Sequence, residues 1–134
     1  MKLFSKNRKK CNLKIHLVMV TKYRKRLFIN DELNLFMKNQ MKLISMRYTF
    51  IIVEMESDIN HMHLLITYPP TVTVSSIVRL LKQQSTYNIW LEFETILQNE
   101  FYKERTFWSD GYYVDSVGST SEDNIIKYIR NQGK

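Results

Sequence analysis

The chain has 134 residues, of which 44% are hydrophobic and 25% charged, so it can fill one core and form one domain, 1–134. Its three glycines, two adjacent prolines and single cysteine exclude the collagen-like, low-complexity and disulfide-stabilised classes. The formal net charge is +7, and no acidic residue precedes Asp31.

A basic segment opens the chain. Residues 1–30 contain ten lysines and arginines, whereas the rest of the chain has a net charge of −3. Such a concentrated positive field attracts polyanions, with nucleic acid as the first candidate and a solvated basic tail as the alternative. The basic residues 1–10 are not followed by a secretory apolar stretch, and no run approaches the roughly 18 apolar residues of a membrane span. With Cys11 as the lone cysteine, we expect a cytoplasmic protein that does not enter a membrane.

The first strand and helix are predicted from hydrophobic periodicity. Apolar residues alternate from Leu13 to Thr21, which predicts a strand with one face more fully buried than the other. Asn30 is expected to cap a helix that carries two acidic residues in its first turn. Apolar residues at helical spacing extend that helix to about Ile44.

A predicted hairpin and a second helix follow. The runs Tyr48 to Glu56 and His61 to Tyr68 are rich in β-branched and aromatic residues and are separated by a polar turn, so we expect adjacent antiparallel strands. Two prolines end the second run. Thr73 is then expected to cap a helix that runs towards Trp90.

The last third of the chain predicts a strand and a final helix. After an ambiguous helical stretch to about Lys103, Tyr112 to Val117 is predicted as the fourth strand. Thr120 and Asp123 resemble a capping box for a helix through Asn131. The resulting order is typical of the ferredoxin-like, RRM-like α+β fold, a four-stranded antiparallel sheet with helices on one face, here with a C-terminal helix appended. Single-stranded nucleic-acid binders often use this sheet, although the fold alone implies no function.

His61 and His63 form the first chemically informative motif, on the third predicted strand. Residues two apart project from the same face of a strand, so both imidazoles face one way while Met62 packs on the other side. Two neutral nitrogen ligands on a rigid element can hold a divalent metal and leave coordination positions open. The alternative is a pair of partly exposed surface histidines.

Tyr128 and Gln132 form the second motif, on the final helix. They are four residues apart and lie on one helix face, next to apolar residues that hold this face near the body of the protein. The glutamine carbonyl is a hard oxygen ligand that could complete the set begun by the histidines. The tyrosine could act as a nucleophile if its phenolate is stabilised, and a packing role is the alternative.

Five blocks of sequence together resemble a known family. They are IHLVMVTKYR (15–24), NHMHLLI (60–66), VRLLK (78–82), FWSDGYYV (107–114, followed by Val117 and Gly118) and KYIRNQ (127–132). In this order and spacing they are similar to the TnpA-type single-tyrosine HUH transposases of small prokaryotic insertion sequences. The resemblance covers about residues 11 to 132.

This resemblance implies a mechanism and a set of site residues. His61, His63 and Gln132 match the ligands of a Mg²⁺ or Mn²⁺ ion, and Tyr128 matches the nucleophile, which lies on a catalytic helix over 120–132. In the family the tyrosine attacks a phosphate of single-stranded DNA, giving a 5′-phosphotyrosine and a free 3′-OH. The resemblance also implies a homodimer with composite active sites, in which the last helix of one subunit joins the histidine strand of the other, and recognition of imperfect DNA hairpins at the element ends.

The sequence leaves three activities to distinguish. The first is a transposase that cleaves and rejoins single-stranded DNA, the second a non-catalytic single-strand binder, and the third a metal-dependent phosphodiesterase that uses water. All three would use basic side chains for phosphate contact. The candidates are Arg8, Lys9, Lys10, Lys22, Arg24, Lys25, Arg26, Arg79 and Lys82.

Overall fold

The structure, a computed structural model, describes residues 11–134 and contains one four-stranded sheet within them. The strands are β1 (Leu13–Val20), β2 (Ile51–Asp58), β3 (His61–Tyr68) and β4 (Tyr113–Ser116). Their order in the sheet is β2-β3-β1-β4, and every neighbouring pair is antiparallel. The predicted ferredoxin-like α+β fold is therefore confirmed.

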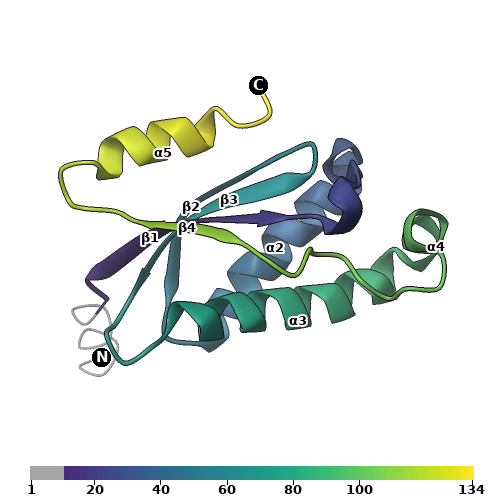
Figure 1. Ribbon diagram of the computed structural model, residues 1–134, viewed down its shortest axis with the longest axis horizontal. Helices are drawn as coiled ribbons and strands as arrows, with labels where there is room; N and C mark the ends of the chain where they lie inside the picture. The colour runs from purple at the N-terminus through teal and green to yellow at the C-terminus, as the bar shows by residue number, and fades with distance from the viewer. Residues whose placement is uncertain (1–10) are drawn as a thin grey trace.

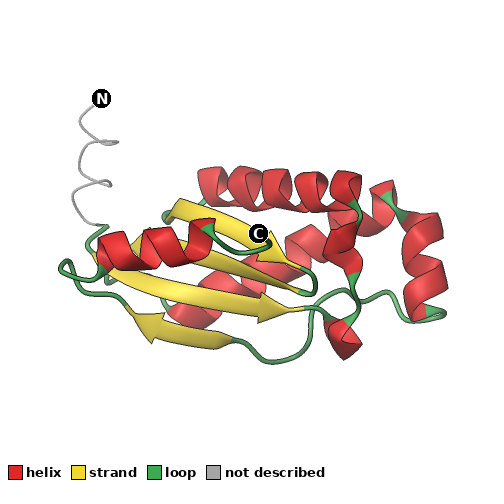
Figure 2. Cartoon of the chain, turned by 90° about the horizontal axis from the view of Figure 1, so that it is seen from above, coloured by secondary structure: helices red, strands yellow, loops and turns green. Residues whose placement is uncertain are grey.

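Helices cover the two faces of this sheet unequally. α2 (Asp31–Arg47) and α3 (Val74–Glu92) lie together against one face, and α5 (Glu122–Arg130) lies alone against the other (Figures 1 and 2). The appended C-terminal helix is thus separated from the main helical layer by the sheet. The remaining elements are α4 (Glu94–Phe101) after α3 and two short 3₁₀ helices between β1 and α2, η1 (Lys22–Arg24) and η2 (Leu27–Ile29).

Two of the predicted helix starts are confirmed by their side-chain caps. The Leu33 backbone N–H donates to Asn30 Oδ1 at 3.0 Å, and the Ser76 backbone N–H donates to Thr73 Oγ1 at 3.2 Å. Each cap satisfies an amide that has no partner within the helix. Within residues 11–134, no helix is both long and apolar enough to cross a membrane.

The main core lies between the sheet and the α2–α3 layer. β1 turns Ile15, Leu17 and Met19 towards these helices, and β3 turns Met62 and Leu64 the same way; all five side chains are buried. The period of two predicted for both strands is therefore correct. Because the core is continuous and close-packed, it fixes the positions of the outward-facing side chains on the opposite face.

A second, smaller cluster holds α5 to the other face. Leu65, Val117 and Ile129 are buried together, with Ile125 and Ile126 packed partly against them. Ion pairs add to this attachment: Arg130 Nε lies 3.3 Å from Glu54 Oε1 on β2, and Lys14 on β1 pairs with Glu122.

Some predicted boundaries were wrong. β2 begins at Ile51 rather than Tyr48, because α2 continues to Arg47 and Tyr48 serves as its C-cap. α5 spans 122–130 rather than 120–132, and the capping box expected from Thr120 and Asp123 does not form. The N-cap residue is Ser121, which already has helical backbone angles and whose hydroxyl donates to the Gly118 carbonyl.

Candidate active site

The histidine strand β3 presents both imidazoles on the face that carries α5. Met62 and Leu64 point into the main core and are fully buried, so alternation turns His61 and His63 the other way. In the sheet, His63 lies opposite Val18 of β1 and Glu56 of β2. The ring centroids of the two histidines are 4.9 Å apart. The predicted common orientation of the pair is therefore confirmed.

His63 is buried, with 4% of its surface exposed, and one of its nitrogens lacks a partner. Its Nδ1 lies 3.0 Å from Nε2 of His16 on β1, whereas its Nε2 has no hydrogen-bond partner among residues 11–134. Burial, reinforced by the His61 and His16 rings against an opposing effect of Asp58, lowers the pKa of His63 to about 4. The imidazole is therefore neutral at neutral pH, which is the form that binds metal.

His61 is oriented by the turn before the strand. Its Nδ1 lies 2.8 Å from Asn60 Oδ1, and because an amide oxygen can only accept, Nδ1 carries the proton. In the neutral ring, Nε2 is therefore the nitrogen that carries the lone pair, and it lies 3.9 Å from Asp58 Oδ2. Nε2 is the ligand candidate on both histidines, because Nδ1 of each already faces a polar partner.

His16 is a site residue that sequence reasoning interpreted as a packed or surface strand histidine. It contacts both His63, with ring centroids 5.2 Å apart, and Tyr128, with centroids 5.8 Å apart. Burial lowers its pKa, while the carboxylate of Asp115, which faces it from β4, opposes that shift. The signal that the sequence offered was strand alternation: Leu17 faces the core, so the adjacent His16 faces the opposite side of the sheet, where the other two histidines lie.

α5 brings Tyr128 to the histidines of its own chain. The tyrosine ring is 5.6 Å from the His63 ring, centroid to centroid, with the planes inclined by 78°. Its neighbour Ile129 is fully buried beneath the helix, whereas Tyr128 itself is 52% exposed. The nucleophile candidate therefore packs against the His63 ring and remains open to solvent, although it does not line the hollow that contains His61 and His63.

Gln132 lies beyond the end of α5, in the turn that follows Arg130. Its Nε2 donates to the Tyr128 carbonyl at 3.0 Å, and it lines a hollow with Ser57 and Asp58 rather than the hollow that contains His61 and His63. Gly133 makes this turn possible, since it has φ of +80° and a Cβ there would lie 2.9 Å from the Ser57 carbonyl oxygen. The role of Gln132 as a metal ligand stays a prediction.

The histidine pair fits a divalent metal ion. His63 Nε2 is a buried polar atom with no hydrogen-bond partner among residues 11–134, and His61 Nε2 is oriented by a hydrogen bond from the opposite ring nitrogen. Among residues 11–134, no group of three or more His, Cys, Asp or Glu side chains could hold the ion. A divalent ion bound to the two histidines would therefore need further oxygen ligands, from an amide, water or phosphate group.

A hollow of about 290 Å³ opens beside the pair. It is lined by His61 and His63 and by Arg24 and Tyr113 from neighbouring segments. Arg24 and the preceding Tyr23 have positive φ values of 52° and 59°, a conformation that costs non-glycine residues free energy. This 3₁₀ turn thus places a cation next to the histidines despite its backbone strain.

The predicted DNA-contact residues occupy different environments. Arg8, Lys9 and Lys10 lie outside the described residues. Arg24, Arg26 and Arg79 are exposed, whereas Lys22 and Lys25 have carboxylates at 3.6 and 3.8 Å, from Asp110 and Glu100 respectively. Lys82 donates to the carbonyls of Ser109, Asp110 and Gly111, so its ammonium is already used within the protein.

Comparison with known proteins assigns this arrangement to a family. A family model described as "Transposase IS200 like" matches residues 9–132, which include the histidine pair, Tyr128 and Gln132. The chain belongs to the IS200-like transposase family. It is 33% identical over 121 residues to the transposase of insertion sequence IS200 from Salmonella typhimurium, covering 90% of this chain and 77% of that protein.

Two further relatives come from Deinococcus radiodurans. The ISDra2 transposase TnpA is 22% identical over 120 residues, covering 90% of this transposase and 84% of that protein. A solved structure of a Deinococcus protein assigned to the transposases superposes with a TM-score of 0.71 at 26% identity, covering 90% and 91% of the two chains.

A REP-associated tyrosine transposase bound to a REP hairpin shares the fold. Its TM-score is 0.64 at 14% identity, over 87% of this chain and 64% of that one.

Proposed function

We propose that this transposase cleaves and rejoins single-stranded DNA at the ends of an insertion sequence through a covalent 5′-phosphotyrosine on Tyr128. The observation that carries the proposal is the Tyr128 ring packed edge-on against the His63 ring, with centroids 5.6 Å apart, while the buried Nε2 of His63 has no hydrogen-bond partner among residues 11–134. A nucleophile candidate and a metal-ligand candidate thus lie in contact on the sheet face that carries α5, and Arg24 lines the hollow beside the histidines. This combination supports phosphoryl transfer.

In the proposed reaction the chain supplies binding, orientation and the attacking oxygen. A divalent cation, Mg²⁺ or Mn²⁺, would be held by His61 and His63 and would supply Lewis-acid polarisation of the scissile phosphate. Gln132 would become the third ligand only after its side chain leaves the hollow that it lines with Ser57 and Asp58. The Tyr128 hydroxyl loses its proton and its oxygen forms a bond to phosphorus, while the bond to the 3′ oxygen breaks and that oxygen takes up a proton. Attack by a 3′-OH on the phosphotyrosine reverses these changes, so no ATP is consumed.

The proposed partners are hairpin DNA and a second copy of the chain. The REP-associated tyrosine transposase of the same fold is bound to a hairpin, and we extend that substrate class to this family member. The small cluster around Ile129 holds α5 to the sheet separately from the main core. α5 could therefore dock on a second subunit at modest cost, giving composite sites in a homodimer.

A covalent trapping experiment tests the proposed chemistry. Wild-type protein is incubated with labelled single-stranded DNA from the flanks of its own gene, including hairpins, with Mn²⁺ or Mg²⁺, and resolved on a denaturing gel. We expect a shifted protein–DNA band that disappears in Tyr128→Phe and with a chelator. Tyr102→Phe is the matched control, because Tyr102 is exposed and lies away from the histidines; it should form the adduct normally.

The other outcomes identify the alternatives. Cleavage that survives Tyr128→Phe without an adduct would show that water is the nucleophile. Salt-sensitive binding that survives both Tyr128→Phe and chelation, with no cleavage, would show a non-catalytic single-strand binder.

A mixing experiment tests the composite site. Tyr128→Phe and His63→Ala proteins are each inactive in the proposed mechanism, but a mixed dimer would contain one intact composite site if α5 is exchanged between subunits. Recovery of adduct formation on mixing would support exchange. No recovery, with mixed dimers demonstrated by differently tagged chains, would show that each subunit uses its own Tyr128.

A further inference from the structure

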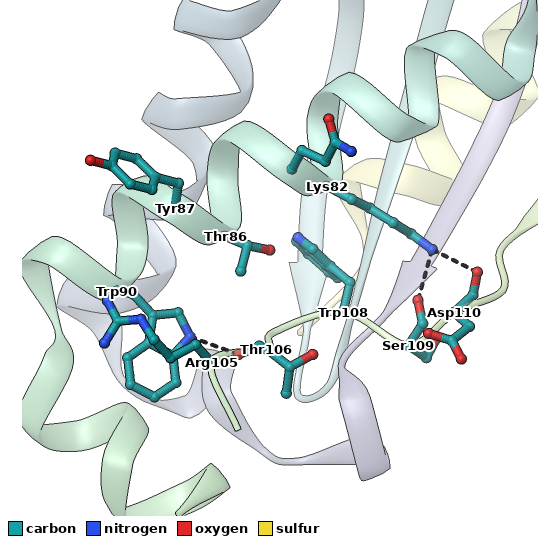
Figure 3. A pocket seen from close by; sticks show the side chains of 10 residues that line it. Lys82, Thr86, Tyr87, Trp90, Arg105, Thr106, Trp108, Ser109 and Asp110 are labelled. Atoms are coloured by element: carbon teal, nitrogen blue, oxygen red, sulfur yellow. Dashed lines mark hydrogen bonds between the residues drawn. The ribbon is translucent and has the colours of Figure 1, made fainter. Parts of the chain in front are cut away.

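A third hollow lies away from the histidine face, between the C-terminal half of α3 and the segment 105–110 (Figure 3). Its volume is about 530 Å³, which is within the range of small-molecule and cofactor sites. The floor is formed by two indoles, Trp90 and Trp108, which are only 2% and 5% exposed. Neither indole belongs to the candidate active site.

Both indoles are fixed by hydrogen bonds. Trp90 Nε1 donates to the Thr106 carbonyl at 2.8 Å, and Trp108 Nε1 donates to Ser85 Oγ at 3.0 Å. Their polar edges are thereby satisfied and their orientation is set before any ligand arrives. The two buried rings therefore form a rigid base that keeps the shape of the hollow before any ligand binds.

The exposed wall of this hollow combines a cation with an aromatic ring. The guanidinium carbon of Arg105 lies 4.6 Å from the centroid of the Trp90 ring, and the Arg105 side chain is 56% exposed, with its Nη1 3.6 Å from the exposed carboxylate of Glu94. Tyr87, from α3, is 66% exposed and lines the same hollow (Figure 3). A planar guanidinium and a tyrosine ring are surfaces on which nucleobases stack.

A chain of shared lining residues connects this hollow to the candidate active site. Ser109 lines both the indole-floored hollow and an intermediate hollow of about 420 Å³. The intermediate hollow in turn shares Val20, Arg24 and Tyr113 with the hollow that contains His61 and His63.

The intermediate hollow also combines aromatic rings with nearby cations. Three tyrosines line it, Tyr23, Tyr112 and Tyr113, and Lys82 Nζ lies 5.7 Å from the Tyr112 ring centroid. The bonds from Lys82 to the carbonyls of residues 109–111 fix the segment that separates it from the indole-floored hollow. Aromatic rings among cations line the whole route.

The charge of the route is complementary to a nucleic-acid strand. Arg24, Lys82 and Arg105 line the three connected hollows, and Asp110 is the carboxylate among the lining residues. Aromatic surface interleaved with net positive charge is the combination that binds single-stranded nucleic acid, through stacking and phosphate attraction. A duplex offers no free base faces to such a surface.

We propose that single-stranded DNA runs from the histidine pair through the intermediate hollow, and that one unpaired nucleobase stacks on Arg105 and Tyr87 in the indole-floored hollow. This assignment rests on the proposed single-stranded DNA activity and adds a base-binding site remote from the reacting phosphate. The site anchors the strand at a fixed number of nucleotides from the scissile bond.

Fluorescence of 2-aminopurine tests the proposed base site. The analogue is placed in turn at each position of a single strand that carries the cleavage site, and binding is measured without metal. We expect one position away from the scissile phosphate to be quenched by wild-type protein. In Tyr87→Ala and Arg105→Ala the quenching at that position should disappear, and affinity should fall roughly five- to 150-fold, as for the loss of one stacked base.

Matched controls and a second substitution make the test specific. Tyr102→Ala and Arg47→Ala change exposed residues of the same types outside the three hollows and should leave both signals unchanged. An abasic nucleotide at the quenched position should weaken binding to wild type but not further weaken binding to Tyr87→Ala. Independent, additive losses would overturn the proposal, because the base and the tyrosine would then not be in contact.

The adduct assay on the same strand separates this inference from the proposed function. If the Tyr128 adduct forms and no position responds to Tyr87 or Arg105 substitution, the base site is wrong and the transposase chemistry stands. If the base site responds and no adduct forms, the hollow binds single-stranded DNA and the proposed chemistry is wrong.

Discussion

The two faces of the sheet differ in what they bury. The face covered by α2 and α3 packs Leu17, Met19 and Leu64 into a continuous apolar core. Among residues 11–134, the opposite face holds the small cluster around Ile129, and beside it lie His16, His63 and Tyr128. The main core thus lies on one face of the sheet, and the candidate catalytic residues lie on the other. The histidines are held rigidly because their strand neighbours are locked into the core behind them.

The largest stability effect is expected from a truncation in the main core. Leu17→Ala should lower the free energy of unfolding by about 2–5 kcal/mol, because Leu17 is fully buried and the close-packed core collapses only partly around the cavity. Urea unfolding followed by circular dichroism measures this. If Leu17→Ala lowered the free energy of unfolding no more than a truncation under α5, the α2–α3 face would not be the main source of stability.

A truncation under α5 should separate activity from stability. Ile129→Ala removes the buried anchor of α5 and should cost about 2 kcal/mol, at the low end for a core isoleucine, since the cluster beneath it is small. Adduct formation should fall more steeply than stability, because Tyr128 would lose its fixed position beside His63. Leu43→Ala, an exposed leucine on α2, is the control and should change neither. Unchanged adduct yield in Ile129→Ala would show that α5 need not be held by this cluster.

His16 should tune metal binding without being a ligand. Its Nε2 lies 3.0 Å from His63 Nδ1, so His16→Phe removes the group that orients His63. We expect Mn²⁺ affinity to fall roughly tenfold to a hundredfold, as for other partners of ligating histidines. Electron paramagnetic resonance of free Mn²⁺ measures it without reference to activity. His16→Asn, which keeps a polar partner, should lose less, and equal losses in both variants would argue for a packing role alone.

The last prediction concerns the pH dependence of stability in the metal-free protein. His63 has a pKa of about 4 in the folded state against its ordinary 6.5, so the unfolded chain binds a proton in this interval that the folded chain does not. Stability should therefore be full above about pH 6.5 and decrease as the pH falls towards about 4. Urea midpoints across this range should fall less steeply for His63→Phe. The same slope in both proteins would show that other groups cause the loss.

Local sequence patterns predicted most helices and strands, because caps and periodic faces depend on residues that are close together in the sequence. The caps at Asn30 and Thr73 form as expected, since a cap and its amide are three residues apart. The false capping box at Thr120 has the right residue types, but the chain leaves β4 through a turn that makes Ser121 the N-cap. That turn is set by where α5 must dock, which no local pattern contains.

The sequence alone determined the family, the antiparallel α+β fold and the common orientation of His61 and His63, because motif order and strand alternation are properties of the chain itself. Tertiary structure decided that His16 hydrogen-bonds to His63, that Gln132 turns into a different hollow, and that three hollows join at Val20 of β1, Arg24 of η1, Ser109 and Tyr113. These outcomes depend on strand register and on where connecting segments pack. Register and packing arise from contacts between residues far apart in sequence, so periodicity within a single element cannot contain them.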